Sequence, residues 1–226
     1  MVFTGAGVSA DSGIATFRDE GGLCSQYRIE DVCTPEALAR NRPLVIEFYH
    51  TRRRAVMASE PNAGHYAIAM LESRFEVSVV TQNVDDLHER AGSTRVLHLH
   101  GELTKLCSEL DHSLITPIQG WEQDPELRGQ DGALLRPHIV FFGEAVPMFE
   151  PATQIAAQAD IMIVAGTSLA VYPAASLIRY APAATPVYLV DPGDPAIHDI
   201  PNLREHIRKN SVEGLPELIS GLMEQV

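Results

Sequence analysis

The sequence predicts an α/β fold built on a doubly wound parallel sheet, with a smaller lobe formed by two insertions. Three observations lead to this prediction. The strand-like runs are short and rich in Val and Ile, as in sheets that are buried on both faces. Helical patterns separate the runs, which indicates parallel strands joined by crossover helices. A glycine-rich turn follows the first run, at the sheet edge where such folds bind their ligands.

The expected elements alternate along most of the chain. Strand-like runs lie at residues 1–4, 75–80, 96–99, 139–142, 161–165 and 187–190. Helical patterns cover about 62–72, 150–158, 173–181 and 213–224, with apolar residues at helical spacing.

Two segments do not follow this alternation. Residues 34–58 have a helical pattern, with Thr34 as N-cap, Pro35 at the first helical position and Pro43 opening a second helix. Residues 102–136 are polar and contain no long periodic element. We therefore expect a single domain whose sheet lobe comprises about 1–20, 59–101 and 137–226. Its small lobe then comprises about 21–58 and 102–136.

Length and charge exclude several classes of protein. At 226 residues the chain suits one mid-sized domain. Its net charge of −13 repels nucleic acid and anionic lipid. No apolar run reaches the ~20 residues of a membrane span, and the three cysteines form no CxxC pair. We expect a cytoplasmic protein that binds neither nucleic acid nor membranes, and the sequence leaves its oligomeric state open.

The glycine-rich turn at residues 5–10 matches the pattern G-x-G-x-x-A. Such glycines let a backbone approach a pyrophosphate, although a plain tight turn is the alternative interpretation. A dehydrogenase would continue with a helix, a second strand and an acidic residue for the ribose. Here Ser12-Gly13 interrupts the helix and the following region is polar and then helical. The sequence thus excludes ordinary hydride transfer but not dinucleotide binding.

Five motifs resemble the signatures of the sirtuins, the NAD-dependent protein lysine deacylases. They lie at 5–14 with Phe17-Arg18, at 81–85, at 98–101, at 136–144 and at 166–168. All occur in the family order and together they span nearly the whole chain. The resemblance implies a single sirtuin-type catalytic domain with a Rossmann-like sheet.

The resemblance also implies a reaction of NAD with an acyl-lysine side chain of a protein or peptide. In that family the acyl oxygen attacks C1′ of the nicotinamide ribose and nicotinamide leaves. A histidine then removes a proton from the ribose hydroxyls, so that the 2′-oxygen attacks the acyl carbon. Water then completes the reaction, and the products are nicotinamide, O-acyl-ADP-ribose and free lysine.

The motifs carry the expected site residues. The resemblance implies that His100, Asn83 and Asp85 are catalytic, and an imidazole accepts protons near neutral pH. Asn83 and Asp85 are equally suited to cap a helix at 84–91, which is compatible with binding. Val140 and Phe142 are expected to line the peptide groove. The expected NAD-binding residues are Gly5, Ala6, Gly7, Ser9, Asp11, Ser12, Gly13, Ile14, Phe17, Arg18, Gln82, Asn83, Val84, Asp85, Gly166, Thr167, Ser168, Asp191, Pro192, Gly193 and Ser211.

One pair of residues indicates the acyl group. Tyr49 and Arg52 lie three residues apart in a predicted helix and resemble the Tyr-x-x-Arg pattern of sirtuins that remove succinyl and malonyl groups. A guanidinium binds a carboxylate through two hydrogen bonds, and a phenol adds a third. The alternative is a solvated basic helix face, because 52–54 is a run of three arginines. We expect the pair to select acidic acyl groups, with acetyl as a second substrate.

The chain departs from the family pattern in three places. Most sirtuins carry two cysteine pairs where this chain has only Cys107 within 102–136, so we expect no zinc there. Ordinary packing of Leu106, Leu110, Leu114, Ile118, Trp121 and Leu134 is expected to hold this segment instead. Cys24 stands where the family usually has a tryptophan. Asp191 occupies the place of an asparagine loop, and its carboxylate still accepts from ribose hydroxyls.

Two other functions remain as alternatives. The first is an ADP-ribosyltransferase or NAD glycohydrolase that uses the same pocket, and the second is a catalytically silent sensor of NAD or ADP-ribose. The groove-like motif at 136–144 favours a deacylase over the first. The presence of His100, Asn83 and Asp85 favours it over the second.

Overall fold

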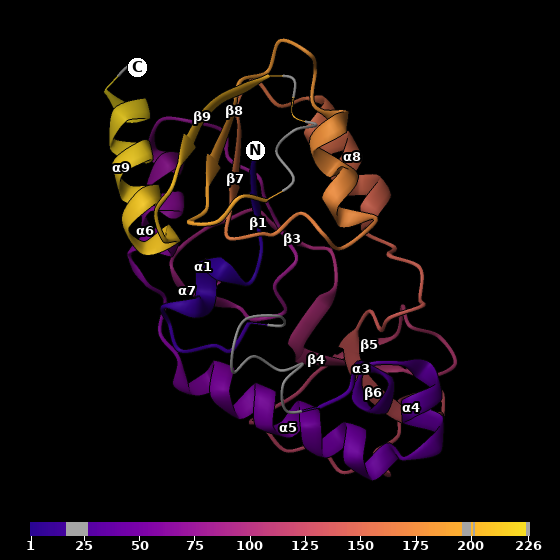
Figure 1. The fold of residues 1–226 in the computed structure, drawn as a ribbon. Coiled ribbons are helices and arrows are strands. Elements are labelled where there is room, and N and C mark those ends of the chain that lie inside the picture. The colour runs from indigo at the N-terminus through magenta and orange to yellow at the C-terminus, as the bar shows by residue number, and fades with distance from the viewer. Residues whose placement is uncertain (17–26, 196–199, 201, 225–226) are drawn as a thin grey trace.

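A six-stranded parallel sheet forms the larger lobe of the computed structural model, which describes residues 1–16, 27–195, 200 and 202–224 (Figure 1). Its strands are β1 (Val2–Thr4), β2 (Val79–Thr81), β3 (Val96–His98), β7 (Met162–Ala165), β8 (Val187–Val190) and β9 (Leu203–Ile207). Their order is β3-β2-β1-β7-β8-β9, and every neighbouring pair is parallel. This is the strand order of dinucleotide-binding sheets, so the predicted fold class is confirmed.

Helices cover both faces of this sheet. Helix α6 (Ala63–Met70), the 3-10 turn η1 (Leu71–Ser73) and helix α9 (Ser211–Met223) cover one face; α8 (Phe149–Ala157) and the 3-10 helix η2 (Ala174–Tyr180) cover the other (Figure 1). Neighbouring strand residues divide between the two cores, with Val2 in one and Phe3 in the other. Both faces of the sheet are therefore buried under apolar side chains, which explains the continuous apolar runs in the sequence.

The small lobe combines three helices with an antiparallel sheet. The helices are α3 (Ile29–Val32), α4 (Pro35–Arg40) and α5 (Arg42–Ala58). The Thr34 hydroxyl accepts from the Ala37 N–H at 3.1 Å, so the predicted N-cap forms. The sheet has the order β5-β4-β6 and consists of β4 (Gly101–Ser108), β5 (Ile115–Pro117) and β6 (Leu135–Ile139).

The structure differs from the sequence prediction at four places. The run at 139–142 is no strand of the parallel sheet, because β6 ends at Ile139 and pairs with β4. The segment 102–136 contains strands, which its polar side chains conceal. The sequence also gives no signal for β9, since residues 204–206 of this edge strand are polar and leave their side chains partly or fully exposed. The helical pattern at 173–181 forms a 3-10 helix.

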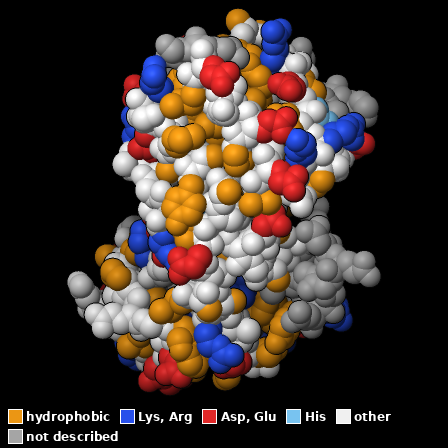
Figure 2. Space-filling view, turned by 90° about the vertical axis from the view of Figure 1, so that its left-hand side faces the viewer, with side chains coloured by type: hydrophobic (Ala, Val, Ile, Leu, Met, Phe, Trp, Pro, Cys, Tyr) orange, Lys and Arg blue, Asp and Glu red, His pale blue; other side chains and the backbone are white. Residues whose placement is uncertain are grey.

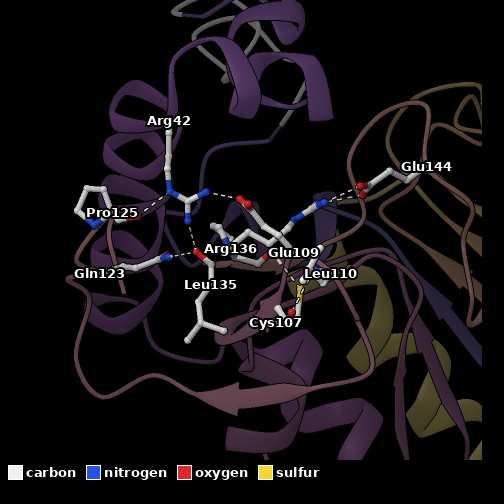
Figure 3. A network of polar contacts seen from close by, with 11 residues as sticks. Arg42, Cys107, Glu109, Leu110, Gln123, Pro125, Leu135, Arg136 and Glu144 are labelled. Atoms are coloured by element: carbon white, nitrogen blue, oxygen red, sulfur yellow. Dashed lines mark hydrogen bonds and ion pairs between the residues drawn. The ribbon is translucent and has the colours of Figure 1, made fainter. Parts of the chain in front are cut away.

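A buried guanidinium ties the two insertions together (Figure 3). Arg42, at the start of α5, donates from Nε to the Pro125 carbonyl at 2.6 Å. Its two terminal nitrogens reach the Glu109 carboxylate and the Leu135 carbonyl. The predicted packing of this segment is present only in part, because Leu106 is buried but Leu110 and Leu114 are 82% and 43% exposed.

Cys107 lies buried on β4, with its Sγ 3.9 Å from the Pro137 carbonyl. Within the described residues, Cys107 belongs to no cluster of three metal-binding side chains. The absence of zinc stays a prediction.

The described surface carries mixed charges. On the face shown in Figure 2, acidic and basic side chains are interspersed with apolar ones, so this face presents no continuous basic patch. None of the described helices combines the length and apolar character needed to cross a bilayer.

Candidate active site

A cavity of about 840 Å³ opens where the two lobes meet. Its walls come from the loops after β1, β2 and β7 and, on the side of the small lobe, from α5 and residues 139–144. Strands β1 and β7 are neighbours in space but not in sequence. The strands β2 and β3 are added on one side of β1, and β7, β8 and β9 on the other, so the strand order switches sides at this point. Parallel sheets bind ligands at this kind of switch point.

Glycines bring two loops of the cavity wall into backbone contact. The Gly7 N–H, at the start of the short helix α1 (Gly7–Ala10), donates to the Gly166 carbonyl at 2.9 Å. Gly166 has a φ of +60°, and a Cβ there would lie 2.4 Å from the Val8 nitrogen. The Val8 N–H donates to the Gly5 carbonyl within the same turn. The glycines therefore serve the close approach of the two loops, and these two N–H groups are occupied.

Most of the predicted NAD-binding residues line this cavity. They are Gly5, Ala6, Gly7, Ser9, Asp11, Gly13, Ile14, Gln82, Asn83, Val84, Asp85, Gly166, Thr167, Ser168, Asp191, Pro192, Gly193 and Ser211. Ser12 does not line it, because its hydroxyl accepts from Asn62 Nδ2 at 3.0 Å and so holds the turn against α6. Phe17, Arg18 and Cys24 lie outside the described residues.

The loop after β2 is held by the chain that follows β3. His100 Nδ1 lies 3.2 Å from the Gln82 carbonyl, and the Leu103 N–H donates to the Val84 carbonyl at 2.8 Å. Gly101 permits this path, since its φ is +81° and a Cβ there would lie 2.0 Å from the His138 carbonyl oxygen. Gln82 also donates from Nε2 to the Thr167 hydroxyl at 2.8 Å, which joins the loops of β2 and β7.

The surroundings of His100 favour a neutral ring. Because a carbonyl only accepts hydrogen bonds, Nδ1 must carry the proton and Nε2 is left with the lone pair. Burial lowers the pKa of His100 below its ordinary value, although the Gln82 carbonyl opposes that shift. The ring is thus a base near neutral pH, as a proton acceptor requires.

Ser9, Asn83 and Asp85 form one buried group at the cavity wall. The Ser9 hydroxyl donates to Asp85 Oδ2 and accepts from Asn83 Nδ2, both at 3.0 Å. Asp85 also accepts from the Leu87 N–H at 3.2 Å, at the start of α7 (Leu87–Arg90). Burial raises the pKa of Asp85 above its ordinary value, although the hydrogen bonds from the Leu87 N–H and the Ser9 hydroxyl oppose the rise. Asp85 therefore both accepts from the first N–H of α7 and lines the cavity.

At the small-lobe end of the cavity, Tyr49 and Arg52 lie on α5. Tyr49 stacks on Phe141 with 5.7 Å between the ring centroids, and its hydroxyl lies 3.9 Å from Cys33 Sγ. The Arg52 guanidinium lies 5.6 Å from the centre of the Tyr49 ring. Val140 and Phe142, the predicted groove residues, line the same cavity.

The arginine run 52–54 is not a solvated basic face. Arg53 is 1% exposed, and it donates to the Leu103 and Trp121 carbonyls at 2.7 Å each. Burial lowers the pKa of Arg53 to about 10. Arg54 is exposed and lies over the Trp121 ring. Of the three arginines, only Arg52 lines the cavity.

Several cavity residues were not predicted from the sequence. They include Cys33 and Phe141 beside Tyr49, and Tyr172, Asp194 and Asn210 near the sheet. Phe141 lies between the two predicted groove residues and could have been found from the motif that contains it. Cys33 precedes the helix cap at Thr34, and nothing in its local pattern distinguishes it from a core residue.

Comparison with known proteins matches this geometry to one family. Residues 5–173 match the model of the Sir2 family. This chain belongs to the Sir2 family. It is 54% identical over 192 residues to an NAD-dependent protein deacylase of Aggregatibacter actinomycetemcomitans, covering 85% of this chain and 92% of that one. It is 48% identical over 223 residues to an NAD-dependent protein deacylase of Bacteroides thetaiotaomicron, covering 96% and 95%.

Solved Sir2 structures show the same fold. A Sir2 homologue–NAD complex superposes with a TM-score of 0.90 at 36% identity, covering 100% of this chain and 89% of that chain. A Sir2 protein bound to acetylated peptide gives 0.79 at 28% identity, covering 99% and 91%. The protein is therefore an NAD-dependent protein deacylase, and NAD is its cosubstrate.

The cavity suits NAD in its chemistry. A side chain at Gly5 or Gly166 would collide with the opposing loop, so the wall stays flat where the two loops meet. Gln82, Asn83 and Asp191 supply the amide and carboxylate groups that bind hydroxyls and carboxamides. Bound NAD supplies an electrophilic ribose carbon with nicotinamide as the leaving group. With NAD bound, His100 would have its Nε2 lone pair available for a ribose proton, and the hydrogen bonds among Ser9, Asn83 and Asp85 would hold this wall in place.

Proposed function

We propose that this Sir2 enzyme acts on acyl-lysine side chains of proteins or peptides and prefers acyl groups that end in a carboxylate. Succinyl and malonyl are the preferred groups, and acetyl is a poorer substrate. The proposal depends on the charge of the cavity at its small-lobe end, where α5 contributes Tyr49 and Arg52.

Arg52 carries the proposal because of its charge. Among the described residues that line the cavity, it is the single Lys or Arg, whereas several carboxylates line the same cavity. An acyl chain with a terminal carboxylate is repelled by those carboxylates and attracted to Arg52. A planar guanidinium binds such a group through two parallel hydrogen bonds, so position as well as charge is selected.

Tyr49 complements this arginine as a neutral donor. Burial, together with the nearby Cys33, raises the pKa of Tyr49 well above its ordinary value, although Arg52 opposes the rise. The phenol therefore keeps its proton. Among the described residues, the hydrogen-bond partner of its hydroxyl is the weakly accepting Cys33 Sγ at 3.9 Å, and a carboxylate is a stronger acceptor than a thiol. Stacking on Phe141 fixes the ring for this contact.

Replacing Arg52 with methionine tests the proposal. Losing a charged hydrogen-bonded pair is expected to lower kcat/KM for a succinyl-lysine peptide by about 10- to 150-fold. The value for the matched acetyl peptide is expected to change by less than about threefold. Both kcat/KM values are measured as the NAD-dependent formation of the deacylated peptide, with succinyl and acetyl peptides of the same sequence.

Arg54→Met is the matched control, because Arg54 lies two residues along the same helix and outside the cavity. It should leave both activities at the wild-type level. Equal losses on succinyl and acetyl peptides in Arg52→Met would refute the carboxylate contact. Nicotinamide release that does not depend on peptide would instead indicate an NAD glycohydrolase.

A further inference from the structure

Two histidines two residues apart hold consecutive carbonyls of the loop after β2. His98, the last residue of β3, places Nδ1 2.9 Å from the Asn83 carbonyl. His100 places Nδ1 3.2 Å from the Gln82 carbonyl. Since carbonyls only accept, both Nδ1 atoms carry a proton. The two rings thus make the same contact on one side.

The rings differ on their other side. His98 Nε2 lies 2.8 Å from Glu89 Oε1, on α7. A carboxylate also only accepts, so both nitrogens of His98 must donate, and only the imidazolium has two N–H groups. His98 is 8% exposed, and each of its two ring nitrogens has a hydrogen-bond partner. The hydrogen-bond geometry thus requires a charged His98, whereas His100 makes its single contact equally well as a neutral ring.

We propose that His98, paired with Glu89, is a positioning residue for NAD binding that acts through Asn83. Each backbone polar group of Asn83 has a partner, since its carbonyl accepts from His98 and its N–H donates to the Thr81 hydroxyl at 3.0 Å. Its side-chain Nδ2 donates to Ser9. These contacts leave the side-chain oxygen Oδ1 as the polar atom of Asn83 that they do not engage. Loss of His98 would leave the Asn83 carbonyl without its donor and so remove one of the contacts that fix the backbone carrying this side chain, while the Ser9 contact remains.

The charges around His98 favour its protonated form. Burial alone would lower the pKa of His98, but the hydrogen bond and charge of Glu89 and the Asn83 carbonyl raise it above its ordinary value. Glu102 adds to the rise, and Lys105 partly offsets that charge by donating to Glu102 at 2.6 Å. The remaining titratable groups that interact with the ring are Asp85 and His88.

Loss of this proton has a defined consequence. A neutral His98 keeps one N–H, and it stays on Nε2, because a lone pair facing the Glu89 carboxylate is more unfavourable than one facing a carbonyl. The Asn83 carbonyl then loses its donor. Because the pKa of His98 is raised, the contact persists to a higher pH than an ordinary histidine would allow, and it is lost as the pH rises through that pKa.

Glu89→Gln should reverse this behaviour. The glutamine amide donates to Nε2, so a neutral His98 keeps its proton on Nδ1 and its contact with Asn83 at alkaline pH. Removing an ion pair is therefore expected to protect NAD binding against alkali. A purely structural role for the pair predicts the opposite.

The test measures NAD affinity by calorimetry without acyl-lysine peptide, so it is independent of the proposed acyl preference. Between about pH 7 and about pH 9, the wild-type Kd is expected to rise about 3- to 10-fold, the cost of one hydrogen bond. The Kd of Glu89→Gln should stay constant. Glu76→Gln is the matched control, because it removes the exposed Arg95 ion pair before β2. It should behave as wild type.

Nitrogen NMR of histidine-labelled protein gives a second measurement that needs no ligand. Both ring nitrogens of His98 should be protonated at neutral pH in the wild type, and only Nδ1 in Glu89→Gln. A wild-type Kd that does not change with pH overturns the proposal. So does a Glu89→Gln variant that weakens with alkali as the wild type does, or a His98 ring that is neutral at pH 7.

Discussion

Replacing His100 with alanine is expected to lower kcat/KM for deacylation by about 10²- to 10⁴-fold, the usual contribution of a positioned general base. The ring lines the cavity, and its Nδ1 is held by the Gln82 carbonyl, so Nε2 is the only proton acceptor that this side chain offers. Steady-state assays with saturating NAD measure the loss. The variant should keep the wild-type melting temperature within about 2 °C, because the Gln82 carbonyl that loses its donor belongs to a partly exposed residue of the cavity wall, where water can replace the histidine.

The pH dependence of this reaction follows from the same ring. Burial lowers the pKa of His100 below its ordinary value, so the base form persists at lower pH than for a free histidine. The acid limb of the wild-type profile should therefore lie below about pH 6.5. His112→Ala is the control, because that histidine is exposed in the small lobe. Undiminished turnover by His100→Ala would exclude His100 as the base.

Replacing Arg42 with methionine is expected to lower the free energy of unfolding by about 3 kcal/mol, the lower end for breaking a buried pair by removing one partner. The Arg42 side chain is only 13% exposed and Glu109 is 31% exposed. The substitution leaves this carboxylate and the Pro125 carbonyl without their donor. For a chain of this size, thermal unfolding should show a fall in Tm of roughly 6–12 °C.

Arg128→Met is the matched control for this prediction. Arg128 lies in the same insertion and is exposed, and it donates only to the nearby Gly132 carbonyl at 2.8 Å. Its loss should change the free energy of unfolding by no more than about 0.5 kcal/mol. Equal melting temperatures for the two variants would show that Arg42 does not hold the lobe.

The sequence predicts the sheet lobe well because burial there is two-sided. The run at 187–190 coincides end to end with β8, whose residues are nearly all buried. The small lobe escapes prediction because its stability depends on contacts distant in sequence. Arg42 and Glu109 carry no local signal that they meet, and β6 contains Arg136 and Pro137, which are atypical of strands.

The site residues could be predicted where a motif places them at a strand end. Gln82, Asn83 and Asp85 share the cavity wall because parallel strands end at one edge of the sheet. Which of the three arginines 52–54 is buried and which lines the cavity could not be predicted. Successive helix residues differ by about 100° in direction, and only packing decides which one is buried. His98 was missed for a similar reason, because its partner Glu89 comes from another element.

If Arg52 selects the acyl group as proposed, helix α5 links substrate choice to the architecture of the small lobe. Its first residue, Arg42, binds the second insertion, while Arg52, about 15 Å further along the axis, lines the small-lobe end of the cavity. Arg53 then anchors the same helix to β4 through the Leu103 carbonyl. A chimaera that imports the helical insertion from another family member must import the second insertion with it. The two segments are separated in the sequence but form one structural unit, so they must be exchanged together.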